Sequence, residues 1–198
     1  MAMQSNVQKS TSAFIFQGTK QLNLNTACIT TKRLNLLPVT DDYAEDMFRE
    51  FTPGITRYMI PSSPKDISET KAFIAETTKL RSQNTDLVLV ILDKDTREFL
   101  GVCGLHPRQN PRQPEFGIWL KASAHGHGYG REAITGLYEW ALQTIEADFF
   151  IYPVDKANIP SKKIPESLGG EIFGEKEVPT MHGGTLDEIV FKIPVRDK

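Results

Sequence analysis

The order of hydrophobic and polar residues along the chain predicts alternating strands and helices. Residues 87–92 form an unbroken apolar run of strand length, which is typical of a central strand buried on both faces. A polar turn and a second apolar run at 99–105 complete a β-hairpin. Further strands are expected at 33–36, 115–120, 149–154, 172–173 and 189–193, and a polar loop at 175–187 separates the last two.

Apolar residues at helical spacing predict four helices between these strands. The first is expected from about residue 40 to 51, where Pro53-Gly54 ends it. The second starts near residue 66, since Asp66 and Glu69 have capping-box spacing, and its predicted apolar face contains Phe73, Thr77 and Leu80. The resulting order, β-α-α-β-β-β-α-β-α-β-β, predicts a mixed sheet with helices on both faces.

The third and fourth helices follow the strands at 115–120 and 149–154. The third is the longest, and its single apolar face is formed by Ile134, Leu137, Tyr138, Ala141, Leu142 and Ile145. The fourth opens at Asn158 and ends at Gly169-Gly170. Pro165 inside this helix is expected to shorten or kink it.

A glycine-rich turn, His125-Gly126-His127-Gly128-Tyr129-Gly130-Arg131, precedes the long helix. Alternate glycines let the backbone pass close to a ligand with its N–H groups pointing outward. The helix start adds unpaired N–H groups and the positive end of the helix dipole. The turn therefore predicts a binding site for a phosphate or pyrophosphate.

Composition and charge narrow the class of protein. The 198 residues suit one domain, with 39% hydrophobic and 24% charged residues, and the net charge of -2 offers no basic excess for nucleic acid. Cys28 and Cys103 lie far apart, so neither a disulfide framework nor a cysteine-rich zinc site is expected, and a reducing cytoplasm fits best. No apolar run reaches the roughly 20 residues of a membrane span, and the N-terminus lacks the apolar stretch of a secretory signal.

The first 27 residues are predicted to be a partly flexible N-terminal extension, followed by one domain at 28–198. The extension begins with polar residues rich in Ser, Gln and Asn. Phe14-Ile15-Phe16 is an apolar island within it. Three interpretations of this island stay open: an added strand, a patch that packs on the domain, or part of a tail.

Several segments, taken in order, resemble the GNAT N-acetyltransferase superfamily. They are 31–36 as the first strand, 99–105 as the glycine-containing hairpin strand, 115–120 as the fourth strand, Gly126 to Ala133 as the acetyl-CoA pyrophosphate loop, and Asn158 with Ser161 before Leu168-Gly169-Gly170 as the Asn-x-x-Ser helix. The likeness covers about residues 31–194, and the branch looks like the one that includes acetyltransferases of ribosomal-protein N-termini. It implies an α/β (α+β) fold with a mixed, mostly antiparallel sheet of six or seven strands.

The resemblance implies acetyl-CoA as co-substrate. The residues implied to contact it are Ile118, Trp119, Leu120, His125, Gly126, His127, Gly128, Tyr129, Gly130, Arg131, Asn158 and Ser161. A backbone N–H of 118–120 would stabilise the oxyanion, and the same strand would hold the pantetheine amides. No metal is expected, because no carboxylate or cysteine lies near the two histidines of the turn in sequence.

Two positions depart from the family pattern. His125 stands where the family usually has Gln or Arg at the head of the glycine loop, so a side-chain contact is expected to be lost while the backbone site is kept. No tyrosine occurs between Ser161 and Leu168, where many relatives place a general acid. The identity of the acid therefore stays open.

Four side chains are candidates for chemistry, each with a plainer interpretation beside it. Glu115 is the preferred general base, against a solvated acid at a strand start. Ser161 is a thiol-side acid or a helix cap, and Asn158 is a cofactor contact or a turn former. His106 is preferred as an ordinary loop histidine.

Four larger side chains are assigned by residue type and position. Trp119 and Tyr138 are expected in the core rather than against a ligand. Arg108 and Arg112 are expected either to select an acidic acceptor or to be solvated.

The predicted activity is direct transfer of an acetyl group to a primary amine, with a protein N-terminal α-amine as one acceptor. One alternative is a small-molecule amine such as a polyamine, antibiotic or amino acid. The other is a non-catalytic acyl-CoA-binding sensor. A cysteine route is disfavoured because Cys103 lies in a strand interior without a base partner. The expected partners are acetyl-CoA and the acceptor, without nucleic acid or membrane, for a cytoplasmic monomer or homodimer.

Overall fold

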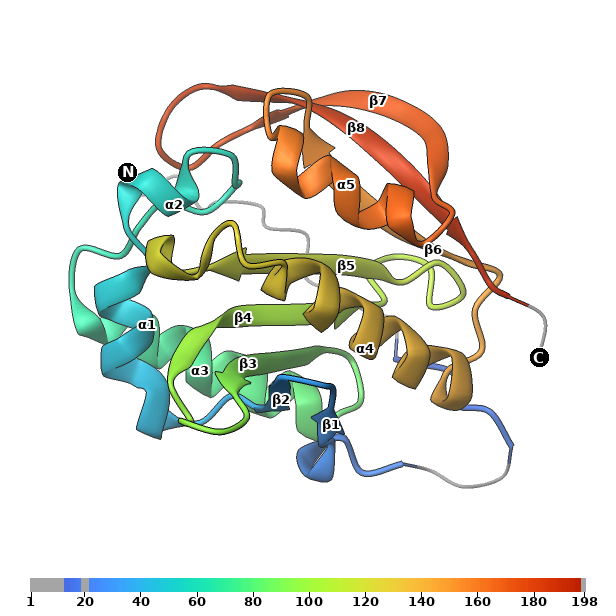
Figure 1. Cartoon of the computed structure of the whole chain (residues 1–198), viewed down its shortest axis with the longest axis horizontal. Coiled ribbons are helices and arrows are strands. Elements are labelled where there is room, and N and C mark those ends of the chain that lie inside the picture. The colour runs from blue at the N-terminus through green and yellow to red at the C-terminus, as the bar shows by residue number, and fades with distance from the viewer. Residues whose placement is uncertain (1–12, 19–21, 197–198) are drawn as a thin grey trace, which may run out of the picture.

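The computed structural model describes residues 13–18 and 22–196. Strands in this part of the chain form one sheet of eight, in the order β1-β2-β3-β4-β5-β6-β8-β7 (Figure 1). Neighbouring strands are antiparallel except β5 and β6, which are parallel. The strands are β1 (Ile29–Thr30), β2 (Leu34–Pro38), β3 (Leu87–Asp93), β4 (Phe99–His106), β5 (Glu115–Leu120), β6 (Phe149–Asp155), β7 (Glu171–Pro179) and β8 (Thr185–Pro194).

Five α-helices of the described chain flank the sheet. They are α1 (Ala44–Glu50), α2 (Pro53–Thr56), α3 (Ile67–Ser82), α4 (Tyr129–Thr144) and α5 (Ile159–Ser167). Figure 1 shows α4 in front of the central strands and α3 behind them. The predicted mixed, mostly antiparallel sheet with helices on both faces is confirmed. The strand count is eight rather than six or seven, and β1 is a two-residue addition at the edge beside β2.

Two apolar cores lie on the two faces of the sheet. The core under α4 includes Leu137 and Tyr138 of that helix, and the other core includes Met47 of α1 and Ile74 of α3. β3 contributes to both. Its residues Leu87, Leu89 and Ile91 join the first core, and Val88, Val90 and Leu92 join the second. The prediction of a central strand buried on both faces is therefore confirmed.

The parallel strands β5 and β6 separate almost at once. Their one registered pair is Glu115 with Ile151, beside a hydrogen bond from the Ile151 N–H to the Pro114 carbonyl. Beyond this pair β5 stays bonded to β4, but no described residue of β6 pairs with it. Backbone groups on that edge of β5 therefore face a gap between two strands of the same sheet.

The buried face of α3 differs from the predicted one. Thr77 is buried as predicted, but Phe73 is 45% exposed and Arg81, which lies outside the predicted face, is buried. The Arg81 guanidinium donates to the Asn25 side chain at 3.0 Å and to the Val39 carbonyl at 3.1 Å. Because these acceptors come from distant segments, hydrophobic periodicity could not reveal that a cation would be buried here.

A predicted loop boundary is wrong, and a short helix was not predicted. The C-terminal hairpin includes most of the expected polar loop, since β7 and β8 leave only residues 180–184 as a turn. β7 is an exposed edge strand whose polar side chains face solvent, so it shows no apolar alternation. The first predicted helix does end before Pro53, since α1 ends at Glu50, but Pro53 also begins the short helix α2, because proline is tolerated at the first helical position.

The N-terminal island packs on the domain, which is one of its three interpretations. Phe14 is 5% exposed and belongs to the core under α4. The Gln17 side chain donates to the carbonyls of Leu142 and Ile145, at the C-terminal end of α4. The remainder of the predicted extension includes residues 1–12, which lie outside the described residues.

Candidate active site

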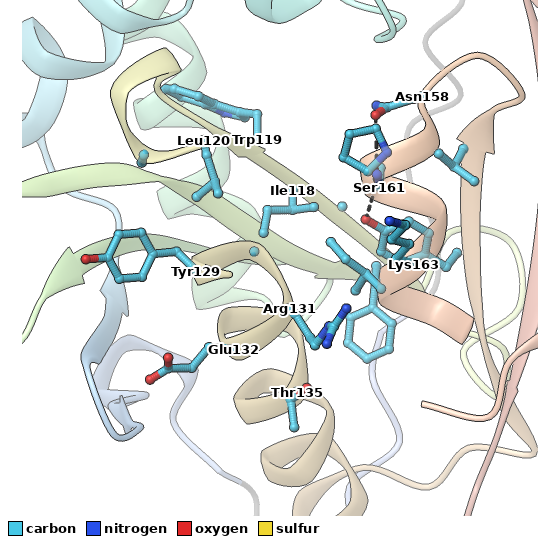
Figure 2. Close-up of a pocket in the computed structure, with 18 of the residues that line it drawn as sticks. Ile118, Trp119, Leu120, Tyr129, Arg131, Glu132, Thr135, Asn158, Ser161 and Lys163 are labelled. Atoms are coloured by element: carbon cyan, nitrogen blue, oxygen red, sulfur yellow. Dashed lines mark hydrogen bonds between the residues drawn. The ribbon is translucent and has the colours of Figure 1, made fainter. Parts of the chain in front are cut away.

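A cleft of about 1660 Å³ opens where β5 and β6 diverge. It is lined by β5, by one side of α4 along most of its length, by the end of β6 and by α5, and it extends to residues 28–33 and to α2 with the segment that follows it. Figure 2 shows side chains from three of these elements around one space: Ile118 and Leu120 from β5, Arg131 and Thr135 from α4, and Ser161 and Lys163 from α5. The fold thus brings the predicted glycine turn, fourth strand and Asn-x-x-Ser helix together.

The glycine turn forms one end of the cleft. Gly126 and Gly128 adopt left-handed φ angles of 80° and 77°, and Gly128 is the N-cap of α4. No described side chain caps this helix start. The N–H groups of the first turn are therefore left for another acceptor, which is the arrangement that binds anions at helix N-termini.

An ion pair between Arg33, just before β2, and Glu132 of α4 supports this turn. Glu132 accepts hydrogen bonds from the Thr31 hydroxyl at 2.6 Å, the Arg33 N–H at 2.7 Å and Arg33 Nε at 2.7 Å. Arg33 Nη1 also donates to the His127 carbonyl at 3.1 Å, and the guanidinium lies 4.5 Å from the Tyr129 ring centroid. Neither Arg33 nor Glu132 was among the predicted site residues, because their contact joins segments about a hundred positions apart.

Glu132→Gln is expected to destabilise the protein at neutral pH but not in strong acid. Burial alone would raise the pKa of Glu132, but hydrogen bonds from Thr31 and Arg33 outweigh it and lower the pKa. A lowered folded-state pKa means that the stabilisation is present above the unfolded value of about 4.3 and is lost as pH falls through the folded value. Urea unfolding at pH 7 should show a loss of about 1–3 kcal/mol. An equal loss near pH 2 would contradict this expectation.

Side chains of β5 alternate between the two faces of the sheet. Trp119 packs against Phe51 and Phe99, with ring centroids 4.8 Å and 5.8 Å apart, and it also lines the cleft. Tyr138 is 1% exposed, so its predicted core position is confirmed, whereas Trp119 is only partly buried against the core beside α1 and α3. His125 Nε2 lies 3.0 Å from the carbonyl oxygen of Leu120, so this histidine ties the turn to the end of β5.

The start of α5 places two hydroxyl groups in contact. Asn158 caps the helix, and its side-chain oxygen accepts from the Ser161 N–H at 3.4 Å. Ser161 Oγ lies 2.9 Å from the phenol oxygen of Tyr152, which belongs to β6. Burial raises the pKa of Tyr152 to about 12, against the effect of the hydrogen bond with Ser161. Although no tyrosine occurs between Ser161 and Leu168, β6 thus places a phenol group beside Ser161.

The two loop arginines are both ion-paired. Arg108 donates to Glu115 Oε1 from Nη2 at 3.0 Å and from Nε at 3.2 Å. Arg112 pairs with Asp148 at 2.8 Å and Glu146 at 3.3 Å. Of these residues, Glu115 lines the cleft. One carboxylate oxygen of this predicted base therefore already accepts hydrogen bonds from the Arg108 guanidinium.

Two other candidates lie away from the cleft. His106 is the last residue of β4 rather than a loop residue, and its Nδ1 contacts a carboxylate oxygen of Asp86. Cys103 is 1% exposed, and burial raises the pKa of its thiol to about 12. A thiol held neutral in the core cannot serve as a nucleophile, which agrees with the preference for direct transfer.

Glu188 lines the cleft but was not predicted from the sequence. It lies in β8 and is 6% exposed. One signal was available in the sequence. Glu188 follows Leu186 by two positions, so the two side chains would lie on the same face of the sheet if the strand began before residue 189. A buried acid in a strand contradicts the usual pattern, and Glu188 lies between the predicted polar loop at 175–187 and the predicted strand at 189–193.

Comparison with known proteins identifies the family. The sequence pattern described as the acetyltransferase (GNAT) domain matches residues 33–171. This chain belongs to the GNAT acetyltransferase family. One GNAT relative, "Uncharacterized N-acetyltransferase p20" from Bacillus licheniformis, is 25% identical over 171 residues, which cover 84% of this chain and 96% of the relative.

Solved structures share the GNAT fold at low identity. The acetyltransferase (GNAT family) from Bacillus anthracis has a TM-score of 0.75 at 16% identity, covering 86% of this chain and 100% of that one. The microcin C7 self-immunity acetyltransferase MccE, in complex with acetyl-CoA and AMP, has a TM-score of 0.73 at 19% identity, covering 83% and 93%. RimL, a ribosomal L7/L12 alpha-N-protein acetyltransferase, has a TM-score of 0.74 at 14% identity, covering 85% and 94%. These structural similarities support the assignment of the GNAT fold.

As a GNAT member the chain is an acetyltransferase. The described residues contain no group of three or more His, Cys, Asp or Glu side chains placed to hold a metal ion. Among the described helices, none combines the length and apolar content that a membrane span requires.

Proposed function

We propose that this GNAT enzyme transfers the acetyl group of acetyl-CoA directly to a primary amine. The observation that carries the proposal is one cleft that joins the uncapped start of α4 to the unpaired edge of β5. The helix start suits a pyrophosphate. The strand edge suits the amides of a pantetheine arm, because an extended chain can hydrogen-bond to a free strand edge.

The contacts to acetyl-CoA are assigned by the place of each residue in the cleft. The turn from His125 to Arg131 binds phosphate oxygens, mainly through backbone N–H groups. The strand Ile118–Leu120 holds the pantetheine and donates an N–H to the developing oxyanion. Asn158 and Ser161 bind the thiol end from α5, and Ser161 protonates the leaving thiolate with the support of Tyr152.

The acceptor enters from the side of β5 opposite to the pantetheine arm. Its amine must be neutral to attack the thioester, and a general base contributes roughly 10²–10⁴ in rate. We assign Glu115 to this amine, either as the base or as a partner of its positive charge. The C–N bond forms, the C–S bond breaks, and no covalent enzyme intermediate occurs.

A protein N-terminal α-amine is the acceptor that we propose. Its pKa near 8 leaves it partly neutral at physiological pH, whereas a lysine near 10.4 needs more help. The volume of the cleft, about 1660 Å³, exceeds the roughly 300–1,000 Å³ of small-molecule sites, so the cleft can hold acetyl-CoA together with an acceptor. RimL, one of the proteins with a similar fold, is named for an acceptor of this kind.

Release of free CoA thiol tests the activity. Acetyl-CoA is offered with peptides bearing free N-termini, the same peptides with blocked N-termini, and a panel of polyamines, antibiotics and amino acids. We expect release above hydrolysis with the free peptides alone. Preference for a small amine would favour the alternative acceptor, and CoA binding by calorimetry without any release would indicate a sensor. An acetylated enzyme isolated after incubation with acetyl-CoA alone would contradict direct transfer.

Ser161→Ala is expected to lower kcat by roughly 100-fold, the scale of losing a general acid, with little change in CoA affinity. Tyr152→Phe should cause a smaller loss because Ser161 remains. The double variant should be no slower than Ser161→Ala if the hydroxyls act as one unit. Since the pKa of Tyr152 is about 12, its ionisation should not reduce kcat below pH 10. Steady-state kinetics checks both points, and fully additive losses would show that the hydroxyls act separately.

A further inference from the structure

Three carboxylates lie near the acceptor end of the cleft. Glu115 and Glu188 are an odd number of positions from Phe116 and Phe191, which belong to the core under α4. Strand alternation therefore directs both acids to the opposite face of the sheet. Asp155 is the register partner of Glu188 across β6 and β8. The diverging strands thus place an acid from β5, β6 and β8 on the same face.

Two of these carboxylates are engaged by protein groups. Asp155 accepts the Ala157 N–H at 2.8 Å with one oxygen and the Asp187 N–H at 3.1 Å with the other. Glu115 accepts the two hydrogen bonds from Arg108. Both charges are therefore compensated within the fold.

Glu188 has an oxygen without a hydrogen bond. Its side chain is 6% exposed, and Oε2 has no hydrogen-bond partner among the described residues. Lys176 Nζ lies 3.3 Å from this oxygen, but its side chain is 46% exposed on the edge strand β7. Burial raises the pKa of Glu188, Lys176 opposes the rise, and the charges of Glu115 and Asp155 add to it. The ion pair with Lys176 leaves this buried oxygen without a hydrogen bond among the described residues, so the site favours a donor that enters through the cleft.

Cations also lie around these acids. Arg108 pairs with Glu115 and Lys176 pairs with Glu188, while Arg57, from the segment after α2, lines the cleft and lies 5.2 Å from the Tyr58 ring centroid. A protonated amine is the ligand that supplies both a donor and a positive charge to Glu188.

We propose that Glu188 binds the ammonium group of the acceptor and removes its proton, an inference that rests on the proposed function and names its base. One proton passes from the ammonium to Glu188 and then to solvent. The neutral nitrogen attacks the thioester carbon, so a C–N bond forms and the C–S bond breaks. The second proton that the nitrogen loses reaches the CoA thiolate through Ser161, and the third stays on the amide. Glu115, fixed by Arg108, holds the acceptor beside Glu188.

The test is Glu188→Gln, which keeps the shape of the side chain and removes its charge. With an acceptor that the wild type acetylates, kcat/KM at pH 7 should fall at least ~100-fold. Because the variant lacks the proposed base, it can use only the fraction of the amine that is already neutral in solution. Its rate should therefore rise about tenfold per pH unit up to the pKa of the amine, near 8 for an α-amine. The deficit relative to the wild type should shrink over the same range.

Two further variants distinguish the loss of a catalytic base from a loss of folded structure. Asp187→Asn is the matched control, because it removes a charge from the adjacent position of β8 on the other face, where the side chain is 57% exposed. It should keep the wild-type profile. Glu188→Asp keeps the acid and should regain part of the activity at pH 7. Thermal unfolding of each variant accompanies the kinetics.

Several outcomes would overturn the assignment of Glu188. They are an unchanged Glu188→Gln enzyme, a loss of equal size at every pH, and a pH-dependent loss found in Glu115→Gln instead. With an active wild type, each refutes this inference and leaves the proposed function intact. A wild type that acetylates no amine refutes both.

Discussion

Gly128→Val is expected to raise the Kd of acetyl-CoA at least ~100-fold, equivalent to about 2.8 kcal/mol. Gly128 has a φ of 77° and is the N-cap of α4. A β-branched residue is a strong outlier at this φ, so the turn must change its path to accept it. Because the proposed phosphate contacts are backbone N–H groups, a change of path removes several of them together. Isothermal calorimetry with CoA measures the loss.

Gly183→Val is the matched control for this variant. Gly183 has a φ of 80° at the tip of the β7–β8 turn, and a Cβ there meets nothing within 4 Å. It imposes the same backbone strain far from the glycine turn, so it should reduce stability without changing CoA affinity. His125→Ala should also have a small effect, since the proposed site uses backbone groups. Normal CoA binding by Gly128→Val would show that the turn is not the phosphate site.

Phe116→Ala is expected to destabilise the fold by about 3–5 kcal/mol, the usual cost of truncating a buried aromatic residue. Phe116 is 1% exposed and stacks on Phe150 of β6 with ring centroids 5.2 Å apart. It also meets Tyr138 of α4 at 6.5 Å. The ring thus joins β5, β6 and α4 next to the point where the sheet divides. Chemical denaturation followed by tryptophan fluorescence measures the change.

Phe73→Ala provides the comparison, because it makes the same substitution at a ring that is 45% exposed. Away from buried contacts the change should stay within about 0.5 kcal/mol. The pair also tests the corrected orientation of α3, since the apolar spacing of that helix had predicted a buried Phe73. Equal losses at the two positions would contradict the burial described for them.

Local patterns account for the parts of the fold that were predicted correctly. The unbroken apolar run of β3 can be satisfied only between two cores, and the glycine turn before α4 needs its conformation whatever surrounds it. The errors share another cause. The buried Arg81 depends on acceptors from two distant segments, and β7 is a strand because β8 pairs with it. Neither partner is visible within a local window.

For this protein, the sequence alone determined the family resemblance, the order of elements and the anion-binding turn, because these depend on residues adjacent in the chain. The tertiary structure decided which other side chains contact these segments. It placed Tyr152 against Ser161, Arg33 and Glu132 behind the turn, and Arg108 on Glu115. It also buried Glu188 beside the cleft with an oxygen that accepts no hydrogen bond from the described residues. These contacts depend on how the strands and helices pack against one another, which no local pattern encodes.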